Sequence, residues 1–424
     1  KIINKMSTKC NSNKTCVLPF SHFIAYPMGD ARACAMSGKI KDVDLNKTSI
    51  DEAFNSKEYK KLRSDMLNGV ENDICKICYN MESRNSESYR QKANNEYKNT
   101  FGLDIEDLIV DIKEDGELKP NFIKLDIRPS NICNFKCRTC SSEYSTRWIE
   151  EEREYNLSKG IEFDESKLIT AEKSYGISDE SIVNLKEIYI AGGEPLYMTE
   201  MYKFIEGIKN KSKTSLHIHT NLTTLKFKKY DVFELLKDFE AINLFISVDG
   251  IGEIGEYIRT GFKWKTFTKN VDKLLIMEEM YPNFHHNFHF TSSILNVFHF
   301  FEFLEEMKKR KYVKTDSQIQ YYPVRWPTYF NSINFNMKNE ILEYYNSNIN
   351  KIESIELKTQ IQNFIDYVAH VDMAQDWETI ENEGGVDAGA IEAFNDVINF
   401  GNKFNKMELP KNLTHLKNII NKLG

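Results

Sequence analysis

The sequence has no apolar run long enough to cross a bilayer, and residues 1–20 contain no apolar signal core. We therefore expect a cytoplasmic protein in a reducing compartment, with no membrane contact. Internal repeats of fixed period and low-complexity tracts are also missing, so a repeat architecture is not expected. There is no basic excess either: 56 Lys and Arg stand against 63 Asp and Glu, a net charge of −7. This balance argues against nonspecific binding to a nucleic-acid backbone, and we expect no nucleic-acid partner.

The chain does contain enough apolar residues for a large core, together with clustered cysteines. Its 424 residues are 41% hydrophobic and 28% charged, which is ordinary for a soluble globular protein with room for a second module. In a reducing compartment, clustered cysteines are more often metal ligands than disulfide partners. The eight cysteines are Cys10, Cys16, Cys34, Cys75, Cys78, Cys133, Cys137 and Cys140.

Strands and helices alternate from residue 122 onward. Expected strands cover 122–127, 187–190, 215–219, 241–248, 288–295 and 318–324, with helices over 143–156, 198–210, 231–238, 264–280 and 299–310. Six such repeats predict a parallel sheet with right-handed crossovers, too short for a closed eight-stranded barrel. The fold class is therefore α/β, a partial (β/α)6 TIM-like barrel. We expect three regions: a small N-terminal module over 1–100 with a hairpin, the barrel over 118–327, and a helical C-terminal region over 328–424. In the last region, residues 340–345, 361–368 and 413–423 have helical spacing.

Three cysteines lie within ten residues, directly after the first barrel strand. Cys133, Cys137 and Cys140 form a C-x3-C-x2-C pattern. Three thiolates on one loop can hold three irons of a [4Fe–4S] cube and leave the fourth iron open to a small chelating molecule. The alternatives are buried free thiols or a zinc site, but a zinc knuckle needs a fourth Cys or His nearby. Residues 141–216 contain neither.

Polar motifs follow the next strands, at the sheet edge where chemistry sits in such folds. Glycines allow close backbone approach, a carboxylate accepts hydrogen bonds from an ammonium group, and a guanidinium suits a carboxylate. Simple turns and a surface salt bridge remain the alternatives. The candidates are Gly192, Gly193 and Glu194 after the second strand, Asn221 after the third, and Ser247, Asp249 and Arg259 after the fourth.

Two further groups carry weaker signals. His217 and His219 share one face of the third strand, where packed core histidines are more frequent than ligands. Arg325 and Trp326 follow the sixth strand, and both core packing and contact with a ligand are open for them.

The cysteine loop and the Gly-Gly-Glu motif together resemble the radical S-adenosylmethionine (SAM) superfamily. The resemblance implies that Cys133, Cys137 and Cys140 are the catalytic cluster ligands and that SAM chelates the open iron. It implies further that Gly192, Gly193 and Glu194 hold the SAM amino group and that Arg259 contacts the SAM carboxylate. The side chains of Ser247 and Asp249 suit the ribose hydroxyls or the carboxylate of SAM, and Asn221 suits SAM or the substrate. Reductive cleavage of SAM would then yield a 5′-deoxyadenosyl radical that abstracts a substrate hydrogen. Thr139 departs from the pattern, since an aromatic residue often precedes the last cysteine in this superfamily.

The N-terminal cysteines form a second group. Cys16, Cys34, Cys75 and Cys78 can close a tetrahedral site, and a structural zinc fits the Cys75-x2-Cys78 spacing as well as a cluster does. The order of motifs over residues 14–327 is similar to that of twitch-domain-containing (SPASM/twitch-like) radical SAM proteins. That resemblance implies a second, auxiliary [4Fe–4S] cluster, although in this chain the module precedes the barrel. Cys10 is left over and is expected to be a plain surface thiol; the alternative is a further ligand or a hydrogen-atom donor.

These patterns together predict a radical SAM enzyme that modifies a peptide, a protein or a small molecule. Its expected partners are that substrate and a reductant such as flavodoxin or ferredoxin. Oxidation or crosslinking and epimerisation are both open as outcomes. The alternatives are a zinc-binding interaction protein and an iron–sulfur electron carrier without SAM chemistry.

Overall fold

The computed structural model describes residues 14–165, 172–324, 337–370, 390–411 and 413. Cys10, Arg325, Trp326 and nearly all of the helix expected over 413–423 lie outside the described residues. No helix in the described part is long and apolar enough to cross a membrane.

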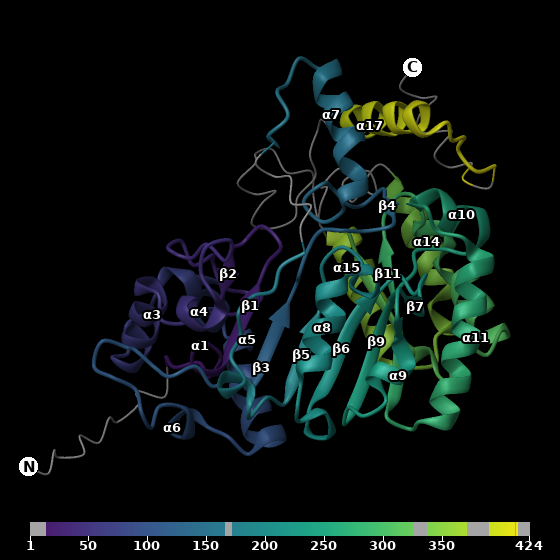
Figure 1. The fold of residues 1–424 in the computed structure, drawn as a ribbon. Coiled ribbons are helices and arrows are strands. Elements are labelled where there is room, and N and C mark those ends of the chain that lie inside the picture. The colour runs from purple at the N-terminus through teal and green to yellow at the C-terminus, as the bar shows by residue number, and fades with distance from the viewer. Residues whose placement is uncertain (1–13, 166–171, 325–336, 371–389, 412, 414–424) are drawn as a thin grey trace, which may run out of the picture. The chain divides into compact units, whose positions relative to one another are not determined.

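One sheet of eight strands organises the fold, in the order β12-β11-β9-β6-β5-β3-β1-β2 (Figure 1). Its strands are β1 (His22–Ala25), β2 (Ala31–Arg32), β3 (Lys124–Ile127), β5 (Glu187–Ile190), β6 (Ser215–Thr220), β9 (Ala241–Ser247), β11 (Phe284–Ser292) and β12 (Ile319–Pro323). Two small ribbons pair β4 (Lys136–Cys137) with β10 (Arg259–Thr260), and β7 (Lys226–Phe227) with β8 (Tyr230–Asp231). The strands β3, β5, β6, β9, β11 and β12 follow one another in the chain and in the sheet, which confirms the α/β class and the six expected strands.

The hairpin expected in the N-terminal module is present, and it joins the barrel sheet. β1 pairs antiparallel with β2 and parallel with β3, with Phe23 opposite Leu125. All four residues of β1 are buried, as expected for a strand covered on both faces. The sequence alone did not indicate this pairing. Module and barrel therefore share a continuous hydrogen-bonded ladder, although the three predicted region boundaries remain a prediction.

Helices connect the barrel strands, and four of the five expected helices begin and end within three residues of the expected bounds. The helix expected over 143–156 begins later, at Ile149, because residues 146–148 form a 3-10 turn. The helices are α1 (Leu18–Ser21), α2 (Ile50–Ala53), α3 (Lys57–Leu67), α4 (Lys76–Ser83), α5 (Tyr89–Glu96), α6 (Ile105–Leu108), α7 (Ile149–Ser158), α8 (Thr199–Gly207), α9 (Val232–Leu236), α10 (Gly252–Ile258), α11 (Trp264–Met280), α12 (Phe300–Lys309), α14 (Lys338–Asn348), α15 (Ile355–His370) and α17 (Ala390–Asn405). Apolar residues three and four apart set the buried face of α12, with Phe300, Phe303, Leu304 and Met307 turned inward.

The chain divides into two compact units. The first comprises residues 1–131, 169–218 and 235–242, and the second comprises 132–168, 219–234 and 243–424. In the first unit, aromatic rings build the core: Phe23 stacks on Tyr59, and Phe54 meets Phe122 edge to face. These residues come from β1, from α3 and from the segments beside α2 and β3, so the core fastens the N-terminal hairpin to the first barrel strand.

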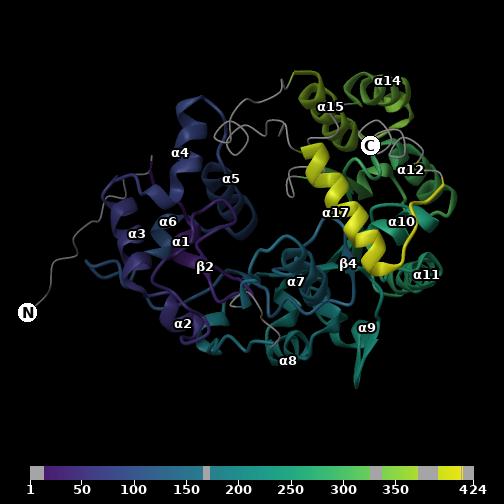
Figure 2. The same ribbon diagram turned by 90° about the horizontal axis from the view of Figure 1, so that it is seen from above.

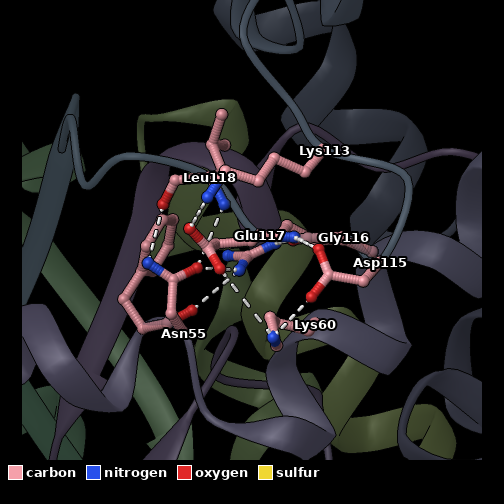
Figure 3. A network of polar contacts seen from close by, with 9 residues as sticks. Asn55, Lys60, Lys113, Asp115, Gly116, Glu117 and Leu118 are labelled. Atoms are coloured by element: carbon pink, nitrogen blue, oxygen red, sulfur yellow. Dashed lines mark hydrogen bonds and ion pairs between the residues drawn. The ribbon is translucent and has the colours of Figure 1, made fainter.

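A polar network fixes the segment that precedes β3 (Figure 3). Asn55 exchanges two hydrogen bonds with the backbone of Leu118, and the fully buried Arg63 donates from Nε to the Gly116 carbonyl at 2.7 Å. Gly116 has φ +85°, and a Cβ there would lie 2.1 Å from the Lys60 carbonyl oxygen, so only glycine fits. The segment is thereby attached to α3 within the first unit.

In the second unit, the C-terminal helices cover the end of the sheet. α15 packs on β12, and the Tyr345 hydroxyl of α14 hydrogen-bonds to Tyr321 at 2.9 Å. The helical segments expected over 340–345 and 361–368 lie within α14 and α15. The helix α17 lies in the region that was expected to be helical, although its own segment was not identified from the sequence. It runs beside α7 in both views (Figures 1 and 2).

Candidate functional site

The cysteine loop lies between β3 and α7, and its middle is held as a strand. β4 contains Cys137 and pairs antiparallel with β10, so that Cys137 lies opposite Arg259 and Lys136 opposite Thr260. The backbone N–H of Arg138 donates to the Ile258 carbonyl at 2.7 Å. Gly261 has φ +106°, and a Cβ there would lie 3.0 Å from the Asn134 carbonyl. The segment after the fourth barrel strand therefore supports the loop directly.

Side chains on either side complete the support of the loop. The Trp148 indole N–H donates to the Cys137 carbonyl at 2.9 Å, and the Ser145 hydroxyl donates to the Phe135 carbonyl at 2.6 Å. The Phe135 N–H lies 3.4 Å from Cys133 Sγ. An N–H directed at a sulfur stabilises the thiolate form that a metal needs.

The charged side chain of Arg259 lies beside one of the loop thiols. Its Nη1 lies 3.7 Å from Cys137 Sγ, and its Nε donates to Asp249 Oδ2 at 2.7 Å. Asp249 is 1% exposed, and its other oxygen accepts the Thr291 N–H at 2.9 Å. Burial opposes the charged form of Arg259, but Asp249 and the loop thiols raise the pKa of the guanidinium above its usual value. Asp249 therefore holds Arg259 in place, and a cation remains fixed beside the cysteines.

Asn221 contacts the loop from the end of β6. Its Nδ2 donates to Asn134 Oδ1 at 2.8 Å, and its Oδ1 accepts the Thr223 N–H at 3.0 Å. Asn221 is buried; its Nδ2 fixes the cysteine loop through Asn134, and its Oδ1 fixes the turn that follows β6. Ser247, which was predicted to act beside Asp249, ends β9 and is half-buried.

The Gly-Gly-Glu motif follows β5 in the first unit. Gly192 has φ +120°, and a Cβ there would lie 2.7 Å from the Ser130 carbonyl oxygen. Gly193 donates its N–H to that same carbonyl at 3.1 Å. Glu194 is 2% exposed, and its Oε1 accepts the Leu196 N–H at 3.1 Å. The two glycines thus permit a close approach of two loops, and a buried carboxylate stands at their end.

The donor set of the cysteine loop fits an iron–sulfur cluster. Burial and the charges of Cys137 and Cys133 raise the pKa of the Cys140 thiol, so the three sulfurs are close enough to repel one another as thiolates. The Ser141 hydroxyl next to them is shielded from solvent and has no hydrogen-bond partner within the described residues. Cations that bind the thiolates relieve the repulsion, and a cluster sulfur could accept the Ser141 hydroxyl hydrogen.

The four N-terminal cysteines converge in the first unit. Burial, followed by the charges of Cys34, Cys75 and Cys78, raises the pKa of the Cys16 thiol. Burial and the same kind of repulsion raise the pKa of Cys75 to about 12. Cys16 lies two residues before α1, Cys34 lies two residues after β2, Cys75 is the N-cap of α4, and Cys78 lies in the first turn of α4. The structure therefore brings these predicted ligands together as a group of their own.

Polar side chains from α5 hold the segment around Cys16. Arg90 donates from Nη1 to the Thr15 carbonyl at 3.0 Å, and Asn94 bonds both the Thr15 carbonyl and the Val17 N–H. The Tyr79 hydroxyl, directly after Cys78, is shielded from solvent and has no hydrogen-bond partner in the described part of the chain. After burial, the charge of Cys75 is the largest influence raising the pKa of Tyr79. An unpartnered O–H donor beside four thiols is the environment in which a sulfur-rich cofactor fits.

Single-ion sites are a separate question. Among the residues that the structure describes, no three or more His, Cys, Asp or Glu side chains are arranged to hold one metal ion. In a cubane cluster, by contrast, each iron binds its own cysteine.

His217 and His219, for which core packing was expected, are both half-buried, and His219 packs against aromatic rings. The His219 ring lies 4.8 Å from the Phe245 ring and 4.9 Å from the His289 ring. Burial lowers the pKa of His289 to about 4. His289 is therefore neutral near pH 7.

Sequence reasoning missed Lys136, Arg138 and Glu151, which surround the cysteine loop. Lys136 and Glu151 form a buried ion pair at 2.5 Å, and Arg138 is 3% exposed. Charged residues beside a metal-binding loop usually read as solvated. The sequence did contain a signal, because Lys136 and Arg138 flank Cys137 and a glutamate-rich segment follows. Only the fold shows that α17 covers these charged side chains.

The chain is similar to one protein family and to several solved structures. Residues 127–277 match the model of the radical SAM superfamily. Similar solved structures include native anSMEcpe with bound AdoMet and Cp18Cys peptide, at 15% identity and TM-score 0.34, covering 54% of this chain and 61% of that chain. Streptococcus suis SuiB bound to S-adenosylmethionine matches at 13% identity and TM-score 0.32, covering 61% of this chain and 53% of that chain.

The chain thus spans less than two thirds of the length of these solved chains. No curated protein matches the sequence. The matched segment begins at the end of β3 and includes the cysteine loop, the Gly-Gly-Glu motif and Arg259. Residues 127–277 of this chain are therefore similar to the radical SAM superfamily.

Proposed function

We propose that this protein is a radical SAM enzyme that modifies a peptide, a protein or a small molecule with the help of an auxiliary [4Fe–4S] cluster. The observation that carries the proposal is the arrangement of three half-buried thiols on one loop, with the fixed guanidinium of Arg259 3.7 Å from Cys137 Sγ. Three protein ligands leave one iron of a cube for a chelating ligand. A cation held at that place suits a ligand that carries a carboxylate.

In this proposal, Cys133, Cys137 and Cys140 hold the catalytic cluster, and Gly192, Gly193 and Glu194 receive the SAM amino group. When bound, the cluster and SAM supply a 5′-deoxyadenosyl radical that abstracts a hydrogen atom from the substrate. The chain's own residues bind the cluster and SAM and orient the cysteine loop. Arg259 faces the loop because Asp249 fixes its other side, and Asn221 holds the loop backbone through Asn134.

The auxiliary site is the finer part of the proposal. Cys16, Cys34, Cys75 and Cys78 are four ligands, which would leave no iron open. A closed cluster could accept an electron from a product radical, which favours oxidation or crosslinking as the outcome over epimerisation. Three of the four thiols are buried, which suits electron transfer better than ligand exchange. The proposed partners are the substrate and a one-electron reductant of the flavodoxin or ferredoxin type, in the cytoplasm.

Two other functions make different predictions. A zinc-binding interaction protein would contain zinc without iron after anaerobic purification. An electron carrier would contain iron but would not bind SAM. The buried Glu194 beside a glycine pair and the Arg259–Asp249 pair favour the enzyme, because neither is needed to hold a cluster alone.

Anaerobic reconstitution with iron and sulfide tests the proposal. We expect about eight irons per chain from two cubane clusters, and release of 5′-deoxyadenosine on reduction with SAM. The Cys137→Ala variant should retain about four irons and release no 5′-deoxyadenosine. A reconstituted, reduced wild-type protein that does not cleave SAM would refute the enzymatic proposal, and about four irons in the wild type would refute the auxiliary cluster alone.

A further inference from the structure

The C-terminal helix α17 contacts the cysteine loop in the second unit through two asparagines. Asn402 Oδ1 accepts hydrogen bonds from Arg138 Nη2 at 2.9 Å and from the Tyr257 hydroxyl at 3.0 Å. Asn405 Oδ1 accepts from Lys136 Nζ at 2.5 Å. Lys136 and Arg138 are the two residues that flank Cys137.

Asn405 also contacts the counter-ion of Lys136. Its Nδ2 donates to Glu151 Oε2 at 2.8 Å, so one amide bridges both members of the buried Lys136–Glu151 pair. The Lys136 ammonium lies 4.9 Å from the Phe404 ring centre, on the same helix. A buried ion pair is stable only when its remaining donors and acceptors are hydrogen-bonded. Asn405 on α17 makes such bonds to both members of the pair.

Close approach of the helix to the loop requires a glycine. A Cβ at Gly401 would lie 2.3 Å from Arg138 Nη1 and 2.6 Å from Glu151 Oε1. Both atoms end flexible side chains, but Asn402 holds Arg138, and Lys136 and Asn405 hold Glu151, so neither can move without breaking a contact. Further along the chain, Met407 Sδ lies 3.6 Å from the Thr260 hydroxyl, on the strand that pairs with the loop.

We propose that α17 is a working part of the cluster site, and that Asn402 and Asn405 are positioning residues that fix Lys136 and Arg138 and thereby the Cys137 thiol between them. The proposal rests on the proposed function in that the loop holds the cluster. It assigns a role to the C-terminal region beyond closure of the sheet end. Neither asparagine contacts the reacting atoms.

A pair of isosteric substitutions tests this proposal. The Asn402 amide only accepts, so Asn402→Asp should keep both bonds. The Asn405 amide both accepts and donates, so Asn405→Asp places a carboxylate against Glu151 and should release the loop. The exposed Asn399 lies on the same helix and provides the control Asn399→Ala.

The first measurement is hydrogen–deuterium exchange of peptides spanning residues 131–145 in the protein as purified. We expect at least tenfold faster exchange in Asn405→Asp, and rates within twofold of wild type in Asn402→Asp and Asn399→Ala. Equal rates in all three variants would overturn the proposal. Faster exchange throughout the chain, rather than in this peptide, would also overturn it, because it would show a general structural role.

The second measurement follows the loaded protein. We expect a chelator to remove the loop-bound iron at least tenfold faster from Asn405→Asp than from Asn402→Asp, with an altered electron paramagnetic resonance spectrum of the reduced cluster. Unchanged iron release and spectrum would overturn the proposal. If the wild-type protein loads iron but fails to cleave SAM, the proposed function fails, while both of these measurements still decide the role of α17.

Discussion

The two groups of cysteines in this molecule are built in opposite ways. Cys133, Cys137 and Cys140 lie on one ten-residue loop, and all three are half-buried. Cys16, Cys34, Cys75 and Cys78 come from separate segments of the first unit, and all but Cys75 are buried. Three accessible ligands suit a site that exchanges a small molecule, whereas four shielded ligands suit a closed one.

The supports of the two groups differ in the same sense. A fixed cation, Arg259, lies next to a loop thiol, and buried charges from Lys136, Glu151 and Arg138 surround the loop. At the N-terminal group, Arg90 pairs with Glu82 and donates a hydrogen bond to the backbone carbonyl of Thr15, next to Cys16. Tyr79 directly follows Cys78. The loop therefore owes its position to charge and hydrogen bonding, and the N-terminal group owes its position to the packing of several elements.

The largest effect is expected from loss of a loop cysteine, which should stop SAM cleavage without affecting the N-terminal cysteine group. Cys137→Ala removes the central loop ligand and should abolish release of 5′-deoxyadenosine, by a factor of about 10³ or more, because the radical cannot form without the catalytic cluster. Iron content should fall by about half. Liquid chromatography of reduced reaction mixtures measures the product, and residual cleavage above a tenth of the wild-type rate would contradict the assignment.

The reciprocal change should leave SAM cleavage intact. Cys75→Ala removes a ligand of the N-terminal group and should also cost about four irons, while 5′-deoxyadenosine formation stays within about threefold of wild type. The two variants together form the control for each other. If Cys75→Ala abolishes cleavage in a protein that remains folded by circular dichroism, the two groups are not functionally separate.

A smaller effect is expected at Arg259. Arg259→Met leaves the Asp249 carboxylate buried without its cation, which should cost about 3–5 kcal/mol in the free energy of unfolding. SAM affinity should fall about 10- to 100-fold, as for other residues that support a metal-bound ligand. Denaturant unfolding and calorimetry measure the two effects.

The double variant Arg259→Met/Asp249→Asn separates them. Removal of the stranded charge should recover most of the stability but none of the SAM affinity. Recovery of both would show that Arg259 acts only as a structural partner of Asp249.

Much of the fold could be predicted from the sequence. The six barrel strands have strong local patterns: β5 was placed with correct ends, and α11 begins and ends where its periodicity indicated. The pairing of β1 with β3 could not be predicted, because a four-residue buried strand carries no mark of its partner. The same holds for α17, whose role depends on contacts with residues more than 240 positions away in the chain, such as Tyr155 with Asp396.

The site was predictable in its ligands but not in its supports. The C-x3-C-x2-C spacing is local, so the three loop cysteines could be identified directly. Asp249 and Asn221 were expected to contact SAM. In the structure, Asp249 fixes Arg259, and Asn221 fixes Asn134. A sequence motif identifies a residue near a site, but only the positions of its hydrogen-bond partners tell whether it is free to meet a ligand. Thr139 is half-buried, and nothing in the structure explains its departure from the family pattern.

The smallest expected effect compares two shielded hydroxyls, one at each cysteine group. Tyr79 follows Cys78, Ser141 follows Cys140, and neither hydroxyl has a partner among the described residues. A hydrogen bond donated to a cluster sulfur favours the more negative, reduced state and raises the midpoint potential. Tyr79→Phe should therefore lower the potential of the auxiliary cluster alone, and Ser141→Ala that of the SAM cluster alone. Each shift should be on the order of tens of millivolts, small against the range of roughly a volt that clusters span.

A redox titration followed by electron paramagnetic resonance resolves the two clusters in one sample, so each variant serves as the control for the other. Both substitutions remove one oxygen and keep the remaining side chain, so a shift cannot be assigned to lost packing. If Tyr79→Phe shifts the SAM cluster, or shifts both clusters equally, then the hydroxyl acts through the protein as a whole. If neither cluster shifts, the buried hydroxyls are satisfied by something other than a cluster sulfur. Either outcome would contradict the prediction that each hydroxyl donates a hydrogen bond to the cluster of its own cysteine group.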